Sequence, residues 1–183
     1  VRDDAQTQAT SYTVQHVVEG QGVQKTDTYA GTAWINEANP TIVVGEGALA
    51  QQAYEGYKYA STSPVVSEGQ AVASGTTITL TYVKDDQATK TLSYTVKYSL
   101  DGAEQTGLTR SYTEAVWVND DDDLAVQPGS IDQRSFTGYR FESIDPEGAA
   151  VGGEVASGTT ITLNYVRDDA QTQATSYTVQ HVV

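Results

Sequence analysis

Alternating apolar and polar residues mark the clearest elements of this 183-residue chain. Over the range 11–18, apolar or aromatic side chains fill every second position: Tyr12, Val14, His16 and Val18. The same alternation returns over 93–100 with Tyr94, Val96, Tyr98 and Leu100. A period of two is typical of a strand with one buried face. We therefore predict a half-buried strand in each range.

A second pair of strands is predicted further along the chain. The range 76–83 places Ile78, Leu80 and Tyr82 on one face, and Ile161, Leu163 and Tyr165 repeat this pattern. A Ser-Gly pair precedes each segment and predicts the turn that starts it. These pairs are Ser74-Gly75 and Ser157-Gly158.

Two more strands are expected over Thr28–Ile35 and Gly56–Ser61. Pro64 closes the latter, and Pro146 stands at the matching place later in the chain. The range 47–54 is the only candidate helix, but its counterpart over 129–136 is a poor helix former. We expect a short helical turn or a loop there.

The chain repeats itself on two length scales. Val166–Val183 is identical to Val1–Val18, so the sequence recurs after 165 residues. Within that period Val72–Asp86 returns as Val155–Asp169, shifted by 83 residues, with changes only at Thr81/Asn164 and Lys84/Arg167. Such copies are typical of tandem arrays in which each unit contacts itself and its neighbours. We interpret the chain as a window from an array of alternating modules, A and B.

This organisation predicts a β-rich α+β protein of two tandem modules arranged as an elongated rod. Module A spans 11–86 and module B spans 93–169. The range 1–10 is the end of a preceding repeat with its linker, 87–92 is a linker, and 170–183 is a linker with the first strand of the next module A. Since Ser176–Val183 lacks the rest of its module, we expect it to be disordered or paired with another chain.

Composition narrows the classes of partner. The formal net charge is −14, which argues against nucleic acid and anionic lipid as partners. The chain has no cysteine and no methionine, as suits an oxidation-tolerant protein outside the cell. There is no apolar run long enough to span a bilayer and no signal peptide. A window from the middle of an array would lack both a secretion signal and a surface anchor.

Three short motifs carry a resemblance to a known family. They are Tyr94–Tyr98 (YTVKY) followed by Asp101-Gly102, a Gly-Tyr pair followed by an aromatic residue at 138–141, and Gly158–Val166 (GTTITLNYV). With these motifs, over 11–86 and 93–169, the chain resembles MucBP and related tandem modules of bacterial cell-wall adhesins. Its near-identical repeats are also similar to the SHIRT class.

This resemblance implies a ubiquitin-like β-grasp fold in each module, with a first hairpin, a crossover and a last strand beside the first. It also implies a surface protein of a Gram-positive bacterium, anchored to the cell wall through a region outside this window. The neighbouring repeats of the same chain would then be the partners of each module.

Catalytic chemistry is not predicted. His16, of which His181 is the copy, occupies the place of the core-facing Tyr98, so we expect a packed imidazole. Catalysis or metal binding at His16 would need partner residues that the sequence does not supply. No serine lies in a nucleophile-elbow pattern, and the glycine pairs lie in β turns. We predict no enzyme activity and no cofactor.

Acidic clusters are candidates for calcium, an ion that prefers oxygen ligands. One candidate is Asp120 with Asp122, in a run of four aspartates whose equivalent in module A is Glu37–Pro40 (EANP) and which has no EF-hand spacing. The others are the pairs Asp85-Asp86 and Asp168-Asp169, where an ion could stiffen a junction. We favour a solvated loop and soluble linkers over metal sites.

Trp34 and Trp117 occupy one place in the two modules, out of phase with the apolar pairs Ala33/Ile35 and Val116/Val118. This phase predicts a tryptophan off the main core of each module. Indole rings bury at domain joints and also stack on sugars. We favour packing at the module edge or joint and keep ligand contact as the alternative.

One pair of residues changes together between the modules. Module B has Lys97 and Asn164 where module A has Gln15 and Thr81. Lys and Asn on neighbouring strands of some bacterial surface modules form an isopeptide bond assisted by a buried acid, for which Glu142 is the nearest candidate. That reaction needs a dry site, whereas this face is polar, so we predict a cross-strand hydrogen bond.

These features indicate a non-catalytic stalk that projects a binding domain from the cell wall. In the first alternative, the repeats bind host mucin or glycan, and many weak contacts add by multivalency. In the second alternative, the chain forms filaments by strand addition. Tryptophans exposed along one side would favour binding, and tryptophans buried at joints would favour the stalk.

Overall fold

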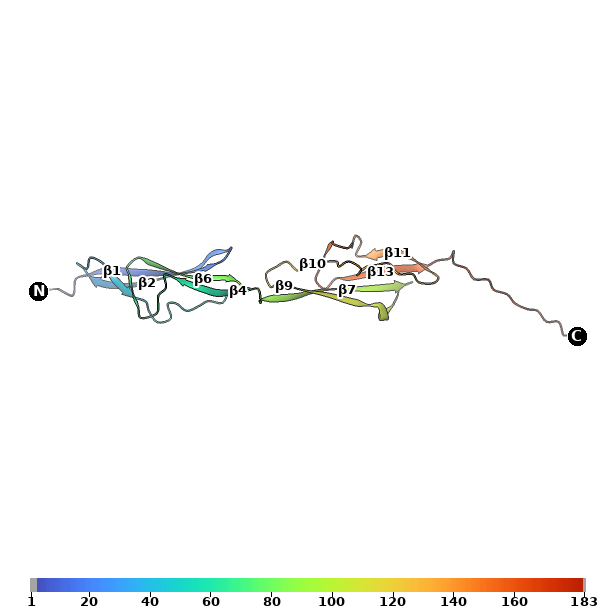
Figure 1. The fold of residues 1–183 in the computed structure, drawn as a ribbon, viewed down its shortest axis with the longest axis horizontal. Helices are drawn as coiled ribbons and strands as arrows, with labels where there is room; N and C mark the ends of the chain where they lie inside the picture. Colours follow the sequence, from blue (N-terminus) through green and yellow to red (C-terminus); the bar gives the residue numbers. More distant parts are fainter. Residues whose placement is uncertain (1–2, 183) are drawn as a thin grey trace. The chain divides into compact units, whose positions relative to one another are not determined.

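The computed structural model describes residues 3–182 and contains two compact units (Figure 1). The first unit consists of the residues up to Thr89 together with Trp117–Asn119. The second unit consists of Lys90–Val116 and the residues from Asp120 onward. Both units are β-rich, and each has a core of its own.

The first unit is built on a four-stranded sheet in the order β2-β1-β6-β4. Its strands are β1 (Thr7–Val18), β2 (Gly22–Trp34), β4 (Tyr57–Ser63) and β6 (Thr76–Lys84). A separate antiparallel pair joins β3 (Thr41–Val43) to β5 (Ala71–Ala73). β1 and β2 form an antiparallel hairpin, and β6 runs parallel to β1. The predicted hairpin, crossover and last strand beside the first are therefore present.

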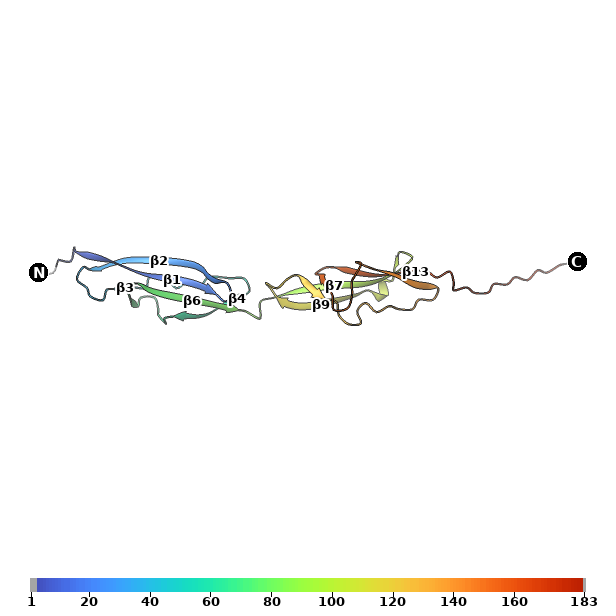
Figure 2. The same cartoon turned by 90° about the horizontal axis from the view of Figure 1, so that it is seen from above.

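The second unit repeats this order with a divided second strand. Its sheet contains β7 (Thr89–Leu100), β8 (Ala103–Glu104), β11 (Tyr139–Asp145) and β13 (Thr160–Arg167) in the order β11-β13-β7-β8. β9 (Arg110–Trp117) also pairs with β7, and β10 (Asp123–Ala125) pairs with β12 (Glu154–Ala156). A 3-10 helix, η1 (Thr106–Leu108), separates β8 from β9. Three strands of this unit, β7, β9 and β13, are labelled in Figure 2.

The alternating residues of the sequence form the two cores, as predicted. In the first unit the buried set includes Tyr12, Val14, Val18, Ile78, Leu80 and Tyr82. In the second it includes Tyr94, Val96, Tyr98, Ile161, Leu163 and Tyr165. Burial of aliphatic and aromatic side chains stabilises each sheet by about 1.5–3 kcal/mol for each fully buried large side chain.

Tyrosine hydroxyls hold the crossover loops to these sheets. In the first unit the Tyr12 hydroxyl accepts the Gly45 N–H at 2.9 Å, and in the second the Tyr94 hydroxyl accepts the Gln127 N–H at 2.9 Å. A buried phenol that keeps a partner for its hydroxyl avoids the cost of desolvating it. The loops that carry no regular structure are thus fixed from the core side.

Several boundaries differ from the prediction. β1 begins at Thr7, before the expected start at Ser11, because Gln8–Thr10 pairs with Gly31–Ala33. The expected strand over 28–35 begins earlier, at Gly22. Over 46–49 the chain forms a turn, and within residues 3–182 the only helix is η1, so the helical part of the α+β expectation is wrong. No helix of residues 3–182 is long and apolar enough to cross a bilayer.

The repeated terminal segment has two different structures. Ser11–Val17 lies in β1, whereas its identical copy Ser176–Val182 forms no strand and is exposed. The hydrogen-bonding partners of β1 are β2 and β6. The copy in residues 176–182 is paired with no strand in the part of the chain that the structure describes, and Val183 lies outside that part.

Candidate functional site

Trp117 lies against a glycine turn in the first unit. Its indole Nε1–H donates to the Gly56 carbonyl at 3.0 Å, and Asn119 Nδ2 donates to the Glu55 carbonyl at 2.9 Å. The Tyr57 ring meets the indole edge to face, with centroids 5.3 Å apart. Lys84 Nζ lies 4.8 Å from the indole centroid, at cation–π distance. We call this arrangement the tryptophan clamp.

Gly56 is a requirement of the clamp. Its φ of +81° lies in the left-handed region, where glycine is the ordinary residue. A Cβ at this position would lie 2.6 Å from Asn119 Nδ2 and 2.9 Å from the Trp117 ring. Both distances are shorter than van der Waals contact, so the clamp requires glycine at position 56.

The linker that follows β6 forms hydrogen bonds with the residues of the tryptophan clamp. Asp85 N–H donates to the Gly56 carbonyl at 2.8 Å, so this oxygen accepts two hydrogen bonds. The Ala88 carbonyl accepts the N–H of Val118 at 2.9 Å, next to Trp117. Asp85 itself folds the linker, because its carboxylate accepts the Gln87 N–H and pairs with Lys58. These contacts lower the pKa of Asp85 below its usual range.

The same aspartate turn occurs at three places. Asp3 accepts the N–H of Ala5, Asp85 that of Gln87, and Asp168 that of Ala170. In each case the backbone N–H one residue further on donates to the carbonyl of the same aspartate. The candidate calcium pairs at 85–86 and 168–169 therefore include a residue that organises a turn.

The remaining acidic candidates lie beside cations. Asp122 pairs with Lys90 at 2.7 Å, and the Asp120 carbonyl also accepts a hydrogen bond from Lys90. Asp86 lies 3.9 Å from Lys84, and Asp169 lies 3.1 Å from Arg167. Within residues 3–182 no group of three or more His, Cys, Asp or Glu side chains could hold a metal ion.

Trp34 ends β2, and its register partner on β1 is Thr7. Gln8 Nε2 donates to the Trp34 carbonyl at 3.0 Å and to the Glu37 carbonyl at 2.8 Å. Both tryptophans are half-buried and lie outside the main cores, as their phase predicted. Ile35, which is out of phase with Trp34, lies beyond the end of β2 and is 43% exposed.

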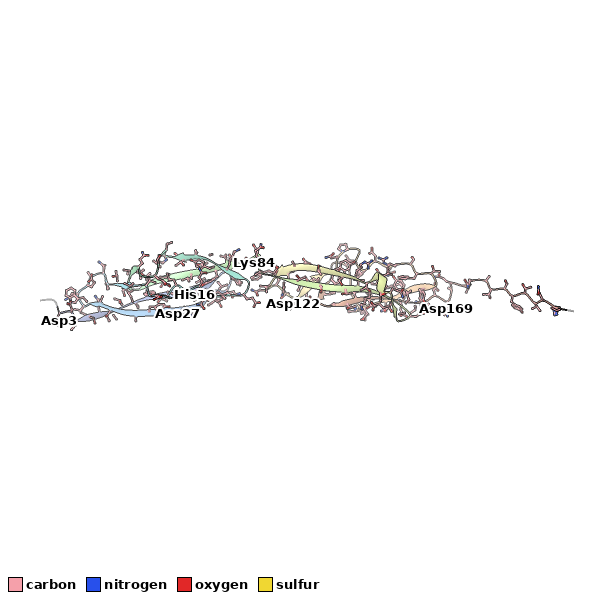
Figure 3. The ribbon with its side chains drawn as sticks, turned by 90° about the horizontal axis from the view of Figure 1, so that it is seen from below. Asp3, His16, Asp27, Lys84, Asp122 and Asp169 are labelled. Carbon is pink, nitrogen blue, oxygen red and sulfur yellow. The ribbon has the colours of Figure 1, made fainter. Side chains whose placement is uncertain are left out.

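His16 is a packed core residue with 2% exposure (Figure 3). Its Nδ1 lies 3.0 Å from the Tyr82 hydroxyl. That hydroxyl already accepts the Gln52 N–H at 2.8 Å, so its own proton is placed to donate to Nδ1 of a neutral imidazole. Desolvation by burial lowers the pKa of His16, Lys25 lowers it further, and Asp27 opposes the shift.

Lys97 and Asn164 have separate partners. Lys97 Nζ pairs with Glu104 at 3.0 Å, and Asn164 Nδ2 donates to Ser143 Oγ at 3.4 Å. The register pairs Lys97 with Thr162, whereas Asn164 lies opposite Ser99. Glu142 is exposed beside a bulge in β11. In place of the predicted hydrogen bond to each other, Lys97 contacts Glu104 on β8 and Asn164 contacts Ser143 on β11.

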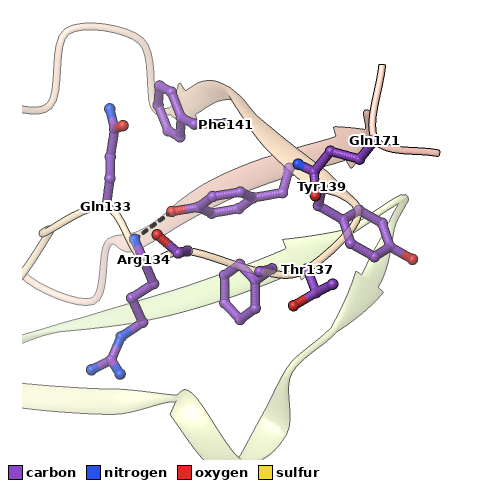
Figure 4. Close-up of a pocket in the computed structure, with 9 residues that line it drawn as sticks. Gln133, Arg134, Thr137, Tyr139, Phe141 and Gln171 are labelled. Atoms are coloured by element: carbon purple, nitrogen blue, oxygen red, sulfur yellow. Dashed lines mark hydrogen bonds between the residues drawn. The ribbon is translucent and has the colours of Figure 1, made fainter. Parts of the chain in front are cut away.

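An open pocket of about 580 Å³ lies at Tyr165 in the second unit (Figure 4). The Tyr165 hydroxyl accepts the Arg134 N–H at 2.8 Å at its inner wall. Burial raises the pKa of Tyr165, and the Arg134 hydrogen bond partly offsets this. Aromatic and neutral side chains form most of the lining, including Phe136, Tyr139, Phe141 and Gln171. The lining contains no pair of acid and base that could transfer a proton.

The partners of Trp117 were not identified from the sequence. Gly56 and Tyr57 are separated from Trp117 by about sixty positions, so no local pattern joins them. The available signals were the repeated Gly-Tyr pairs at 56–57 and 138–139 and the two Trp-x-Asn triplets at 34–36 and 117–119.

Comparison with known proteins gives structural relatives only. No family model and no curated protein matches the chain. It is similar to the crystal structure of Mub-RV, with 16% identity over 87% of this chain and 99% of the other, and a TM-score of 0.30. It is also similar to a type 2 repeat of the mucus binding protein MUB from Lactobacillus reuteri, with 16% identity, coverage of 87% and 100%, and a TM-score of 0.31.

A third similar structure contains domains 3-4 of Streptococcal High Identity Repeats in Tandem (SHIRT) from a cell surface protein. It has 10% identity to this chain, covers 87% of it and 98% of its own length, and has a TM-score of 0.38. These structures include repeats of a mucus binding protein and of the SHIRT class, the two kinds of repeat that the sequence motifs resemble.

Proposed function

We propose that this chain is a non-catalytic, tandem-repeat spacer of a bacterial cell-surface adhesin. In this proposal β-grasp-like modules at 11–86 and 93–169 form an elongated extracellular rod, and a region outside the chain anchors it to the cell wall. The observation that carries the proposal is the recurrence of the sequence after 165 residues in a chain whose two related halves build separate cores. A spacer needs units that add length and fold independently.

The sheet topology supports a load-bearing role for each unit. In the first unit β1 and β6 run parallel in register from Tyr12↔Thr76 to Val18↔Tyr82. In the second unit β7 and β13 pair in the same way. The chain thus enters at one end of such a strand pair and leaves at the other. A pull on the ends therefore acts along these two strands and loads the evenly spaced hydrogen bonds of the parallel pair in shear.

The environment of Trp117 favours a spacer over a glycan-binding repeat. A tryptophan that stacks on a sugar presents a free ring face, whereas the Trp117 ring faces Tyr57 and Lys84 and its N–H is donated to Gly56. These contacts occupy the groups that recognise a carbohydrate. Trp117 is therefore better explained as a packing residue.

Small-angle scattering of the 183-residue chain tests the proposal. A compact globule of this length has a radius of gyration of about 16 Å, and a monomeric rod gives a value well above it. A glycan array is probed in parallel with the parent and with a Trp34→Ala, Trp117→Ala variant. A compact particle, or glycan binding lost in the variant, would contradict the spacer assignment.

A further inference from the structure

The Gly138 turn of the second unit is the counterpart of the Gly56 turn. Both glycines have a φ of +81°. The Gly138 carbonyl accepts the Asp168 N–H at 2.8 Å, as the Gly56 carbonyl accepts that of Asp85. Tyr139 and Arg167 stand where Tyr57 and Lys84 contact the clamped indole.

The two turns differ in what covers them. Gly56 is buried, and a Cβ there would collide with Trp117 and Asn119. Gly138 is half-buried, and a Cβ there would meet no atom within 4 Å. The second turn thus presents the corresponding backbone acceptors, with Tyr139 and Arg167 in the places of Tyr57 and Lys84, around an open space.

That space adjoins the residues that would place a tryptophan. A hollow of about 310 Å³ is lined by Gly138, Thr137 and the range 171–173. Thr172 is the copy of Thr7, and the register partner of Thr7 on β2 is Trp34. A hairpin built on the copied strand would therefore carry its tryptophan to the side of Thr172, where the hollow lies.

In both modules a backbone hydrogen bond joins the residue after the tryptophan to the linker. The residue after each tryptophan donates its N–H to the linker at 2.9 Å, from Ile35 to Gln6 and from Val118 to Ala88. Gln171 is the copy of Gln6 and follows the same aspartate turn, here formed by Asp168. The linker after the second unit is thus already folded as the clamp requires.

We propose that the Gly138 turn is a docking surface for the Trp34–Asn36 segment of a further module A, a second copy from this chain's own array. The Trp34 indole N–H donates to the Gly138 carbonyl, Asn36 donates to the Thr137 carbonyl, and Arg167 lies over the ring. This inference rests on the proposed array function, because it needs a further module A. It goes beyond that function, because an elongated array does not by itself require this contact.

The test uses a chain of two periods, residues 1–183 followed directly by a second copy of residues 19–183. Indole N–H exchange is followed by NMR, with each signal assigned by Trp→Phe substitution. We expect the indole N–H groups of Trp117 and of the second-copy Trp34 both to exchange slowly, because each donates to a glycine carbonyl. Gly138→Ala in the first copy should abolish this protection, because the methyl group fills the space that the ring enters.

Gly158→Ala in the first copy is the matched control. Gly158 also has a positive φ, +87°, and no atom within 4 Å of a built Cβ, but it lies at the turn before β13. It should leave the protection intact. Unchanged exchange in Gly138→Ala, or equal loss in both variants, would overturn the docking surface. Scattering of the same chain reports the rod separately, so a failed clamp and a failed spacer give different results.

Discussion

The two units share the tyrosine hydroxyls that hydrogen-bond to loop backbone, and they differ in the core side chains that pack beside these tyrosines. Tyr82 and Tyr165 each accept a loop N–H at 2.8 Å through the same hydroxyl. Beside Tyr82, however, the core position on the first strand is His16, whereas beside Tyr165 it is Tyr98. The Tyr98 hydroxyl donates instead to the Asp132 carbonyl at 2.9 Å.

This comparison separates two kinds of constraint on a repeated module. A hydroxyl that accepts a partly buried backbone hydrogen bond cannot be lost without leaving that N–H donor without its partner. A side chain that fills volume can change if its neighbours adjust. The comparison can be tested position by position, because most residues of one unit have a counterpart in the other. Trp34 lies on β2 of the first unit, so its fluorescence in a Trp117→Phe background reports the unfolding of that unit, whereas Trp117 ends β9, which pairs with β7 of the second unit.

The largest difference is expected at the two clamp glycines. Gly56→Ala and Gly138→Ala both place a Cβ on a residue with φ of +81°, which costs about 1–2 kcal/mol. Gly56→Ala also collides with Trp117 and Asn119 and should cost a further 1–3 kcal/mol or so. Urea unfolding followed by circular dichroism and by tryptophan fluorescence measures both losses. Equal losses would show that Trp117 contributes nothing at Gly56.

Removing one hydroxyl from each core should give the next largest difference. Tyr82→Phe leaves both Gln52 N–H and His16 Nδ1 without their partner, whereas Tyr165→Phe leaves only the Arg134 N–H. Each lost buried partner costs about 1–3 kcal/mol. Tyr82→Phe should therefore lower the free energy of unfolding, measured in urea, by about 1–3 kcal/mol more than Tyr165→Phe does. A larger loss in Tyr165→Phe would contradict the assigned network.

His16 should make the first unit more sensitive to acid than the second. Burial lowers the pKa of His16 below 6.5, so the unfolded chain takes up a proton that the folded unit resists. Its contribution to stability is complete above the unfolded pKa and falls as pH drops from 6.5 toward the lower folded value. Unfolding followed by tryptophan fluorescence at about pH 7.5 and about pH 5 measures this loss.

The matched variant His16→Tyr places in the first unit the residue found at 98. It should remove the loss of stability between the two pH values, which stay above the range where carboxylates such as Asp85 titrate. An equal loss in His16→Tyr and the parent would assign the acid sensitivity to other groups.

A small gain is expected at Thr10. Its Oγ1 is buried without a hydrogen-bond partner within the described residues, and the counterpart in the second unit is the apolar Leu92. Thr10→Val keeps the shape and removes the unpaired hydroxyl, which should stabilise the first unit by about 1 kcal/mol. Thr10→Ser, which keeps the hydroxyl, is the control and should bring no gain.

No covalent difference is expected between the units. Lys97 is partly exposed and pairs with Glu104, whose pKa that contact lowers. A protonated amine is a poor nucleophile, so an isopeptide bond with Asn164 should not form. Intact mass spectrometry should give the sequence mass. A loss of ammonia, about 17 Da, that disappears in Lys97→Ala would contradict this expectation.

Strand positions in the core could be read from the sequence, because burial of one face imposes a period of two. β1, β6, β7 and β13 follow this rule. The first half of β2 could not, because Gly22–Thr26 lies at a sheet edge with all its side chains exposed and carries no alternation. The three-residue strands β3, β5, β10 and β12 are too short to show any period.

Only part of the candidate site could be predicted from the sequence, for a different reason. The repeated tryptophans signalled a shared role, and their phase placed them off the core. The partner of Trp117 is the backbone carbonyl of Gly56, and a backbone carbonyl cannot be recognised from residue identity. The predicted pairing of Lys97 with Asn164 failed because β8 brings Glu104 to Lys97, and two-residue strands are not readable from sequence.

The difference between His16 and Tyr98 also bears on how a repetitive chain avoids misassembly. Neighbouring repeats of like sequence can exchange equivalent strands while folding, a characteristic failure of multidomain and repeat proteins. If β7 replaced β1 in the first unit, the larger Tyr98 would enter the site of His16, and Leu92 would replace Thr10 beside Gly31. Overpacking of this kind costs about 1–3 kcal/mol at each position. Alternating modules thus keep the most exchangeable partner, the identical one, a full period away along the chain.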